Sequence, residues 1–122
     1  MAKQINHISE ISVSYYPANS HKPIITKSEE AYNVLKHFFP VHTIHLQESF
    51  VVLYLNRCNR VIGVYPLSLG GISGTIADVR LILSVALKSV ASCIMLAHNH
   101  PSGSLSPSKA DSELTIHIII VI

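Results

Sequence analysis

The chain has 122 residues, which is the size of one domain with a single hydrophobic core. Hydrophobic residues make up 48% and charged residues 13%, so the composition favours a well-buried α/β core and excludes an intrinsically disordered chain. The formal net charge is only +2 and the nine Lys and Arg residues form no run, which gives little support to a dedicated nucleic-acid binder. We therefore expect residues 1–122 to form one domain.

Targeting signals and cysteine usage both point to a cytoplasmic protein. The first residues lack the apolar core of a signal peptide, and no apolar stretch approaches the roughly 20 residues that a membrane span requires. Cys58 and Cys93 are far apart in the sequence and have no paired spacing, so we expect two free, buried thiols in a reducing compartment.

The first third of the chain predicts a strand and then a helix. Apolar and polar residues alternate over 11–15, which indicates an opening strand that Pro17 ends. Ser28 is followed by two acidic residues and by apolar residues near helical spacing, so we expect a helix capped by Ser28 and closed by Pro40. We interpret this helix as a packing element without chemistry.

The middle of the chain predicts a hairpin. Residues 49–55 and 61–65 are rich in β-branched and aromatic side chains and flank a short polar turn. Both strands look buried on both faces, so helices are expected to cover the sheet. The glycine-rich residues 69–75 lack the Lys of a phosphate-binding loop, and we do not expect them to bind a nucleotide.

A second helix and a buried strand at 92–97 are expected next. Asp78 is the predicted cap of this helix, and Arg80 in its first turn is better explained by a surface salt bridge than by a functional role. The apolar face of the helix is predicted to comprise Ile82, Val85, Ala86 and Val90.

Three potential metal ligands follow that strand. His98 and His100 are two residues apart at its end, so their side chains are expected on one face. Ser108 precedes Asp111 by three residues, which is typical of a helix start with Ser108 as the cap. Imidazole and carboxylate both bind zinc, and three protein ligands with one open position are the catalytic pattern.

Simpler explanations compete with a metal site. A His-x-His pair is more often ordinary loop histidine, and Asp111 can simply be a favourable charge at a helix start. The adjacent letters His-Asn-His do not indicate an HNH nuclease, in which the three residues are dispersed across the fold. A zinc deaminase requires His-x-Glu and Pro-Cys-x-x-Cys, and neither is present.

The complete pattern favours the metal site. His-x-His-Pro followed by Ser108 and Asp111 resembles the JAMM (MPN+) metalloprotease motif, and residues 98–103 with Pro107 resemble its RadC-like branch. The resemblance extends over residues 11–115. It implies an α/β fold in which helices flank a mixed sheet, a JAMM/MPN (cytidine-deaminase-like) architecture, with zinc held by His98, His100 and Asp111. Glu48 matches the catalytic glutamate of the family, and Ser108 matches its motif serine.

The resemblance also implies a mechanism. Zinc would lower the pKa of its bound water from about 16 to about 7, and Glu48 would take the proton and return it to the leaving amine. Ser108 would donate to the developing oxyanion. This describes a zinc-dependent hydrolase of peptide or isopeptide bonds. Two alternatives stay open: a DNA repair or recombination accessory protein of the RadC type, and a catalytically inactive, zinc-stabilised binding module.

Two departures from the family affect these expectations. Longer RadC-like proteins carry an N-terminal helix-hairpin-helix region, which is not found here, and they continue beyond the motif with more helix and a further strand. This chain instead ends in the apolar residues 116–122, so we expect a domain that is truncated or altered at its C-terminus. Because such a segment is costly to leave in water, we expect it to pack on its own core or to pair with another chain in a homo-oligomer.

Overall fold

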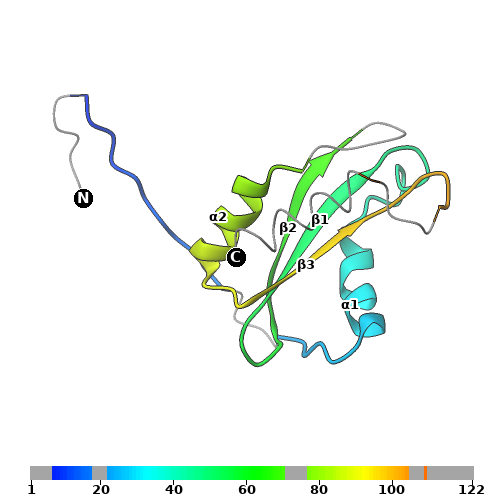
Figure 1. The fold of residues 1–122 in the computed structure, drawn as a ribbon, viewed down its shortest axis with the longest axis horizontal. Coiled ribbons are helices and arrows are strands. Elements are labelled where there is room, and N and C mark those ends of the chain that lie inside the picture. The colour runs from blue at the N-terminus through cyan, green and yellow to red at the C-terminus, as the bar shows by residue number, and fades with distance from the viewer. Residues whose placement is uncertain (1–6, 18–21, 71–76, 105–108, 110–122) are drawn as a thin grey trace.

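The computed structural model describes residues 7–17, 22–70, 77–104 and 109. Its elements, in chain order, are α1 (Ser28–Leu35), the short 3-10 helix η1 (Lys36–Phe38), β1 (Ser49–Leu55), β2 (Val61–Leu69), α2 (Val79–Ser89) and β3 (Cys93–His98). The three strands form one sheet in the order β2-β1-β3, and β1 is antiparallel to both neighbours (Figure 1).

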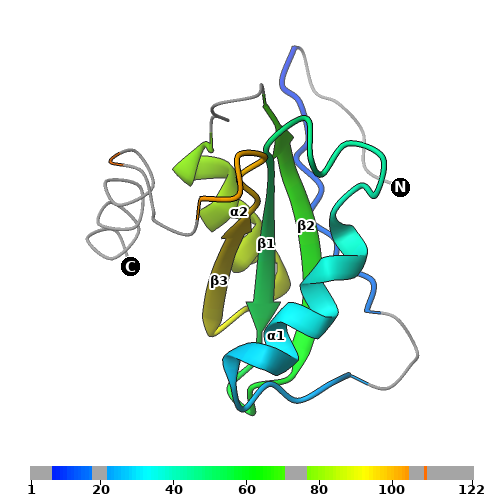
Figure 2. The same cartoon turned by 90° about the vertical axis from the view of Figure 1, so that its right-hand side faces the viewer.

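The central strand β1 organises the core. All seven of its residues are buried, because each face of the strand is covered by a different helix. On one face Val51, Leu53 and Leu55 pack with Ala31 and Leu35 of α1. The opposite face packs against α2, as Figure 2 shows, and its buried residues are Phe50, Val52, Tyr54, Ile82 and Ala86.

The expected α/β class with flanking helices is confirmed, as is the hairpin. Strand β2 continues to Leu69, four residues beyond the expected end at Tyr65. Burial on both faces holds only for β1, since β2 and β3 are mostly half-buried at the two edges of the described sheet. Each described strand pair is antiparallel, so the parallel pairing of a mixed sheet is not found among these three strands.

Helices α1 and α2 begin differently. The side chain of Asp78 accepts a hydrogen bond from the backbone N–H of Arg80 at 2.8 Å, which confirms Asp78 as the N-cap of α2. The guanidinium of exposed Arg80 lies 3.2 Å from the Asp78 carboxylate and lowers the pKa of that carboxyl, so the expected surface salt bridge is present. For α1 the prediction was wrong in detail: the N-cap is Lys27, and Ser28 is the first helical residue.

Three expectations about exposure and local structure were wrong. Residues 9–17 form no strand, and the alternating side chains of Ile11 and Val13 are 86% and 72% exposed. Val90 does not belong to the apolar face of α2, because it is the C-cap in a left-handed conformation (φ 58°) and is exposed. Cys58 and Cys93 are free, as expected, but both are exposed rather than buried, since one lies in the hairpin turn and the other begins an edge strand.

Other expectations lie outside the described residues, among them most of the glycine-rich segment 71–76, the proposed helix start at Ser108 and the apolar segment 116–122. None of the helices in the described part of the chain is long and apolar enough to cross a membrane.

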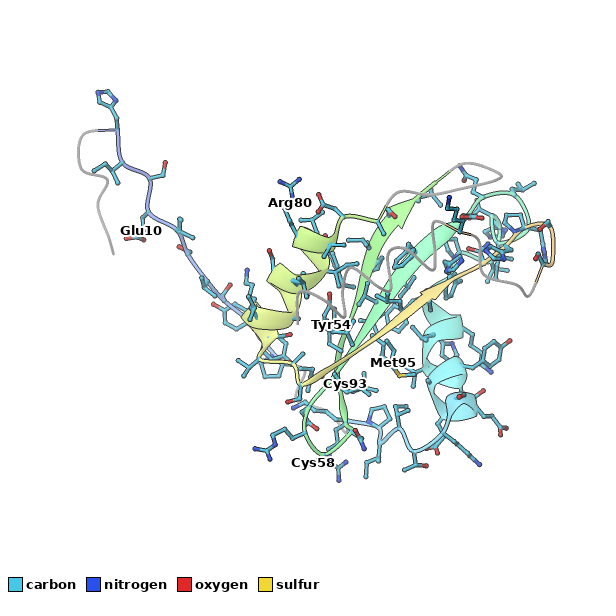
Figure 3. The ribbon with its side chains drawn as sticks, in the orientation of Figure 1. Glu10, Tyr54, Cys58, Arg80, Cys93 and Met95 are labelled. Carbon is cyan, nitrogen blue, oxygen red and sulfur yellow. The ribbon has the colours of Figure 1, made fainter. Side chains whose placement is uncertain are left out.

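A buried hydroxyl links β1 to α2. The side chain of Tyr54 is 1% exposed and donates a hydrogen bond to the carbonyl oxygen of Ile82 at 2.9 Å (Figure 3). Burial raises the pKa of Tyr54 to about 12, from an ordinary value of 10.0.

We expect this hydroxyl to make the fold sensitive to alkali. Because the folded-state pKa is raised, the stabilisation is fully present below about pH 10 and is lost as the pH rises towards 12. Tyr54→Phe should cost about 0.5–1.5 kcal/mol of unfolding free energy at pH 7. It should also flatten the decline in stability between pH 10 and 12, measured by urea unfolding at each pH. An equally steep decline in the variant would assign it to other groups.

Candidate metal centre

The candidate site lies where β3 ends and β1 begins. These two ends are adjacent because the strands are antiparallel, and Phe50 pairs directly with His98 in the register. The sheet therefore brings together two parts of the sequence that are about 50 residues apart, the His98–His100 stretch and the segment that leads into β1.

The two imidazoles converge. The Nε2 atoms of His98 and His100 are 2.9 Å apart, and the rings meet edge to face with their centroids separated by 4.6 Å. The ring of His98 also stacks on that of Phe50, with 5.7 Å between centroids and an interplanar angle of 1°. Stacking on a buried aromatic ring restricts the rotamer of His98, so its Nε2 atom is held towards His100.

The second nitrogen of His100 defines its tautomer. Its Nδ1 atom lies 2.8 Å from the carbonyl oxygen of Ser104. A carbonyl oxygen can only accept, so Nδ1 carries the proton and donates it. The neutral ring then presents a lone pair at Nε2, the atom that faces His98. Protein zinc ligands are oriented in this way, with the far ring nitrogen bonded to a carbonyl oxygen.

The two imidazoles are donors of a type that suits zinc. Two imidazole nitrogens in a tetrahedral site, each about 2.0–2.1 Å from the metal, are roughly 3.3 Å apart, so the 2.9 Å between these two atoms would have to widen slightly to admit the ion. The other predicted ligand, Asp111, and the motif residue Ser108 lie outside the described residues. Within the described ranges, no group of three His, Cys, Asp or Glu side chains is placed to hold a metal, so the ligand set stays a prediction.

Glu48 lies at the same end of the sheet. It is 8% exposed and directly precedes β1, and its carbonyl oxygen accepts a hydrogen bond from the backbone N–H of Gly70 at 2.7 Å. Since side chains alternate along an extended chain, the side chain of Glu48 is expected on the same face of the sheet as that of Phe50. The ring of Phe50 stacks on that of His98. The fold thus places Glu48 at the same end of the sheet as the imidazole pair, while its catalytic role stays a prediction.

Asn99, to which the sequence analysis assigned no role, binds the segment that leads into β1. Its side-chain oxygen accepts from the backbone N–H of Ser49 at 2.7 Å. Its amide nitrogen donates to the carbonyl oxygens of Ile44 and Gln47 at 2.7 and 2.9 Å. These partners are 50 or more residues away, so no local spacing identifies them. The only available signal was the position of Asn99 between two predicted ligands.

A pocket of about 340 Å³ lies behind the candidate site. It is formed mainly by apolar side chains of α1 and β3, and Met95 points into this side of the sheet (Figure 3). His98 and Asn99 also line this pocket, so it reaches one of the two imidazoles.

Comparisons with known proteins identify a family for this chain. A family model described as RadC-like JAB domain matches residues 25–121. This range contains every predicted ligand and both predicted catalytic residues.

Bacterial relatives named UPF0758 protein match a large part of the chain. Those of Flavobacterium johnsoniae and Porphyromonas gingivalis are 45% and 47% identical over 91 residues, which is 75% of this chain and 38% and 39% of theirs. That of Streptococcus sanguinis is 46% identical over 72 residues, covering 59% of this chain and 32% of its own. The matched part thus spans about two fifths or less of the length of these relatives.

Proposed function

Because this chain belongs to the RadC-like JAB domain family, we propose that it is a zinc-dependent hydrolase that cleaves peptide or isopeptide bonds. The observation that carries the proposal is the convergence of the two Nε2 atoms, 2.9 Å apart, with the tautomer of His100 set by the Ser104 carbonyl. This arrangement places two imidazole nitrogens side by side, where a small rotation of the rings would direct both at one metal ion. Asp111 is the proposed third ligand.

The chemistry divides between the metal and the chain. Zinc, when bound, would supply a water of lowered pKa and a positive charge near the scissile carbonyl. The Glu48 carboxylate would accept a proton from the attacking water and deliver it to the leaving amine. The hydroxyl of Ser108 would donate a hydrogen bond to the oxyanion as it forms. The near-complete burial of Glu48 supports this role, because it keeps bulk water away from the carboxylate.

The proposal is tested by metal analysis of the purified protein, combined with cleavage of an unbiased peptide library. We expect one zinc per chain and cleavage that stops when a chelator removes the metal and returns when zinc is added. A thiolate contribution is not expected, since Cys58 and Cys93 are both free and lie away from β3's histidine end. A metal-free protein with all three ligands intact would overturn the proposal.

The same preparation separates the two alternatives. An inactive, zinc-stabilised binding module would contain zinc and cleave no member of the library. A DNA-associated protein would bind duplex DNA with an affinity that falls steeply as salt is raised. The net charge of +2 and the absence of a run of basic residues make such binding the less favoured outcome.

A further inference from the structure

We infer that Asn99 is a positioning residue that fixes the Glu48 segment relative to the imidazole pair. This inference rests on the proposed function, since it assigns Asn99 a role through Glu48. Asn99 touches neither the predicted metal position nor, in the proposed mechanism, the reacting atoms. Its side chain instead connects the backbone between the two histidines to the backbone on both sides of Glu48.

The hydrogen bonds of Asn99 define one orientation of its amide group. The oxygen faces an N–H donor at Ser49, and the nitrogen faces two carbonyl acceptors at Ile44 and Gln47. If the amide were flipped, its oxygen would face the carbonyl oxygens of Ile44 and Gln47, and its NH₂ group would face the N–H of Ser49. The amide group can make four hydrogen bonds, two as a donor and two as an acceptor. Backbone groups of residues 44–49 take up three of them and leave one oxygen lone pair. Few side chains other than Asn match this set of partners.

The bonds bracket the predicted base. Gln47 and Ser49 are the residues on either side of Glu48, and each gives one backbone group to Asn99. The carbonyl oxygen of Glu48 itself is bound by Gly70 of the segment after β2. The backbone is therefore held at three consecutive residues, so the Glu48 carboxylate starts from a fixed Cα position just before β1.

Asn99 and the imidazoles share one short piece of backbone. The rings of His98 and His100 meet each other, and the ring of His98 stacks on Phe50, while the Asn99 side chain is hydrogen-bonded to residues 44, 47 and 49. The same three residues thus hold the imidazole pair together and bind the segment that contains Glu48. Any displacement of this segment changes the distance between the base and the imidazole nitrogens.

The test uses two substitutions and a matched control in the full chain. Asn99→Ala removes all three hydrogen bonds. Asn99→Asp keeps the shape and the acceptor for Ser49 but sets a carboxylate oxygen against two carbonyl oxygens. The control is Asn56→Ala, because the Asn56 side chain also binds two backbone N–H groups, those of Cys58 and Arg60, but in the hairpin turn at the far end of β1.

Hydrogen–deuterium exchange tests, without any substrate, whether Asn99 holds residues 44–49 in place. In Asn99→Ala and Asn99→Asp we expect amides of residues 44–49 to exchange about tenfold faster, while β1 beyond Phe50 keeps its protection. Asn56→Ala should leave residues 44–49 at the parent rate. Unchanged exchange of this segment in both Asn99 variants, with each of them folded, would overturn the inference.

Turnover and zinc content test the consequence for Glu48. We expect both Asn99 variants to retain zinc and to lose roughly 10–100-fold in kcat with little change in KM, as is usual for residues that orient a functional group. Added to Glu48→Gln, the substitution Asn99→Ala should cause no further loss, because the group that it positions is already absent. If the double variant lost kcat by the full additional factor, or if Asn56→Ala lost as much kcat as Asn99→Ala, Asn99 would contribute only to the general stability of the fold.

The two proposals fail in different ways. If Glu48→Gln alone leaves turnover unchanged, the proposed role of Glu48 is wrong, whereas faster exchange of residues 44–49 would still show that Asn99 holds this segment. If exchange is unaffected but Glu48→Gln is inactive, the positioning role is wrong and the hydrolase stands.

Discussion

Replacement of His98 by Ala should release the metal and abolish hydrolysis together. In the parent protein the Nε2 atoms of His98 and His100 lie 2.9 Å apart, so removing one ring leaves half of the described donor pair. Groups that merely orient a zinc ligand are worth about 10–100-fold in affinity, and we expect a ligand itself to be worth more than about 100-fold. Competition with a chelator of known zinc affinity measures this loss directly.

The control for this variant is His37→Ala. His37 is exposed in η1, so its removal takes away an imidazole without touching the site. This control should bind zinc as the parent does. If His98→Ala retains zinc at the parent affinity, His98 is not a ligand, and the proposed metal centre is lost with it.

The second large effect is expected for Glu48→Gln, which should keep zinc and lose roughly 10²–10⁴-fold in kcat. The amide retains the size of the carboxylate and its position before β1, but it cannot accept a proton from water. Steady-state kinetics with a peptide found in the library assay, together with the zinc content, separates this outcome from loss of the metal.

Glu29→Gln is the matched control, since Glu29 is an exposed acidic residue in the first turn of α1. It should have the activity of the parent. A Glu48→Gln variant as active as the parent would remove Glu48 from the mechanism and leave another group to take the proton.

Local patterns predicted the elements whose formation depends on local chemistry. The carboxylate of Asp78 caps α2 through a hydrogen bond two residues away, and the hairpin follows from β-branched residues around a polar turn. The strand expected at residues 11–15 failed for the converse reason. Its alternation is real, but a strand also requires a partner, and Ile11 and Val13 remain exposed in an unpaired segment.

Burial was harder to predict than secondary structure. The two apolar strands of the hairpin look alike in sequence. Among the described strands, however, only β1 lies between two neighbours and two helices, whereas β2 is at an edge. The same cause exposes Cys93, which begins the other edge strand of the described sheet. Strand order depends on pairing between segments that are distant in the sequence. The residues around Cys93 therefore do not reveal that it begins an edge strand.

The site was predictable only where the motif is contiguous. His98 and His100 were identified from two-residue spacing, and the structure brings their rings together. Glu48 was suggested by resemblance alone, and its nearness to β3 follows from the antiparallel register. The hydrogen bonds of Asn99 have sequence separations of 50 to 55 residues, so their existence could be learned only from the fold.

The pairing of Phe50 with His98 has a consequence for insertions and deletions in this family. Because side chains alternate, a slip of one residue between β1 and β3 would turn His98 towards α1 and leave its imidazole facing the wrong layer. Loss or gain of a single codon in either strand is therefore expected to be more damaging than most substitutions there. The turn at residues 56–60 lies beyond the pairing of β1 with β3, so a change of length in that turn should leave the register of Phe50 and His98 intact.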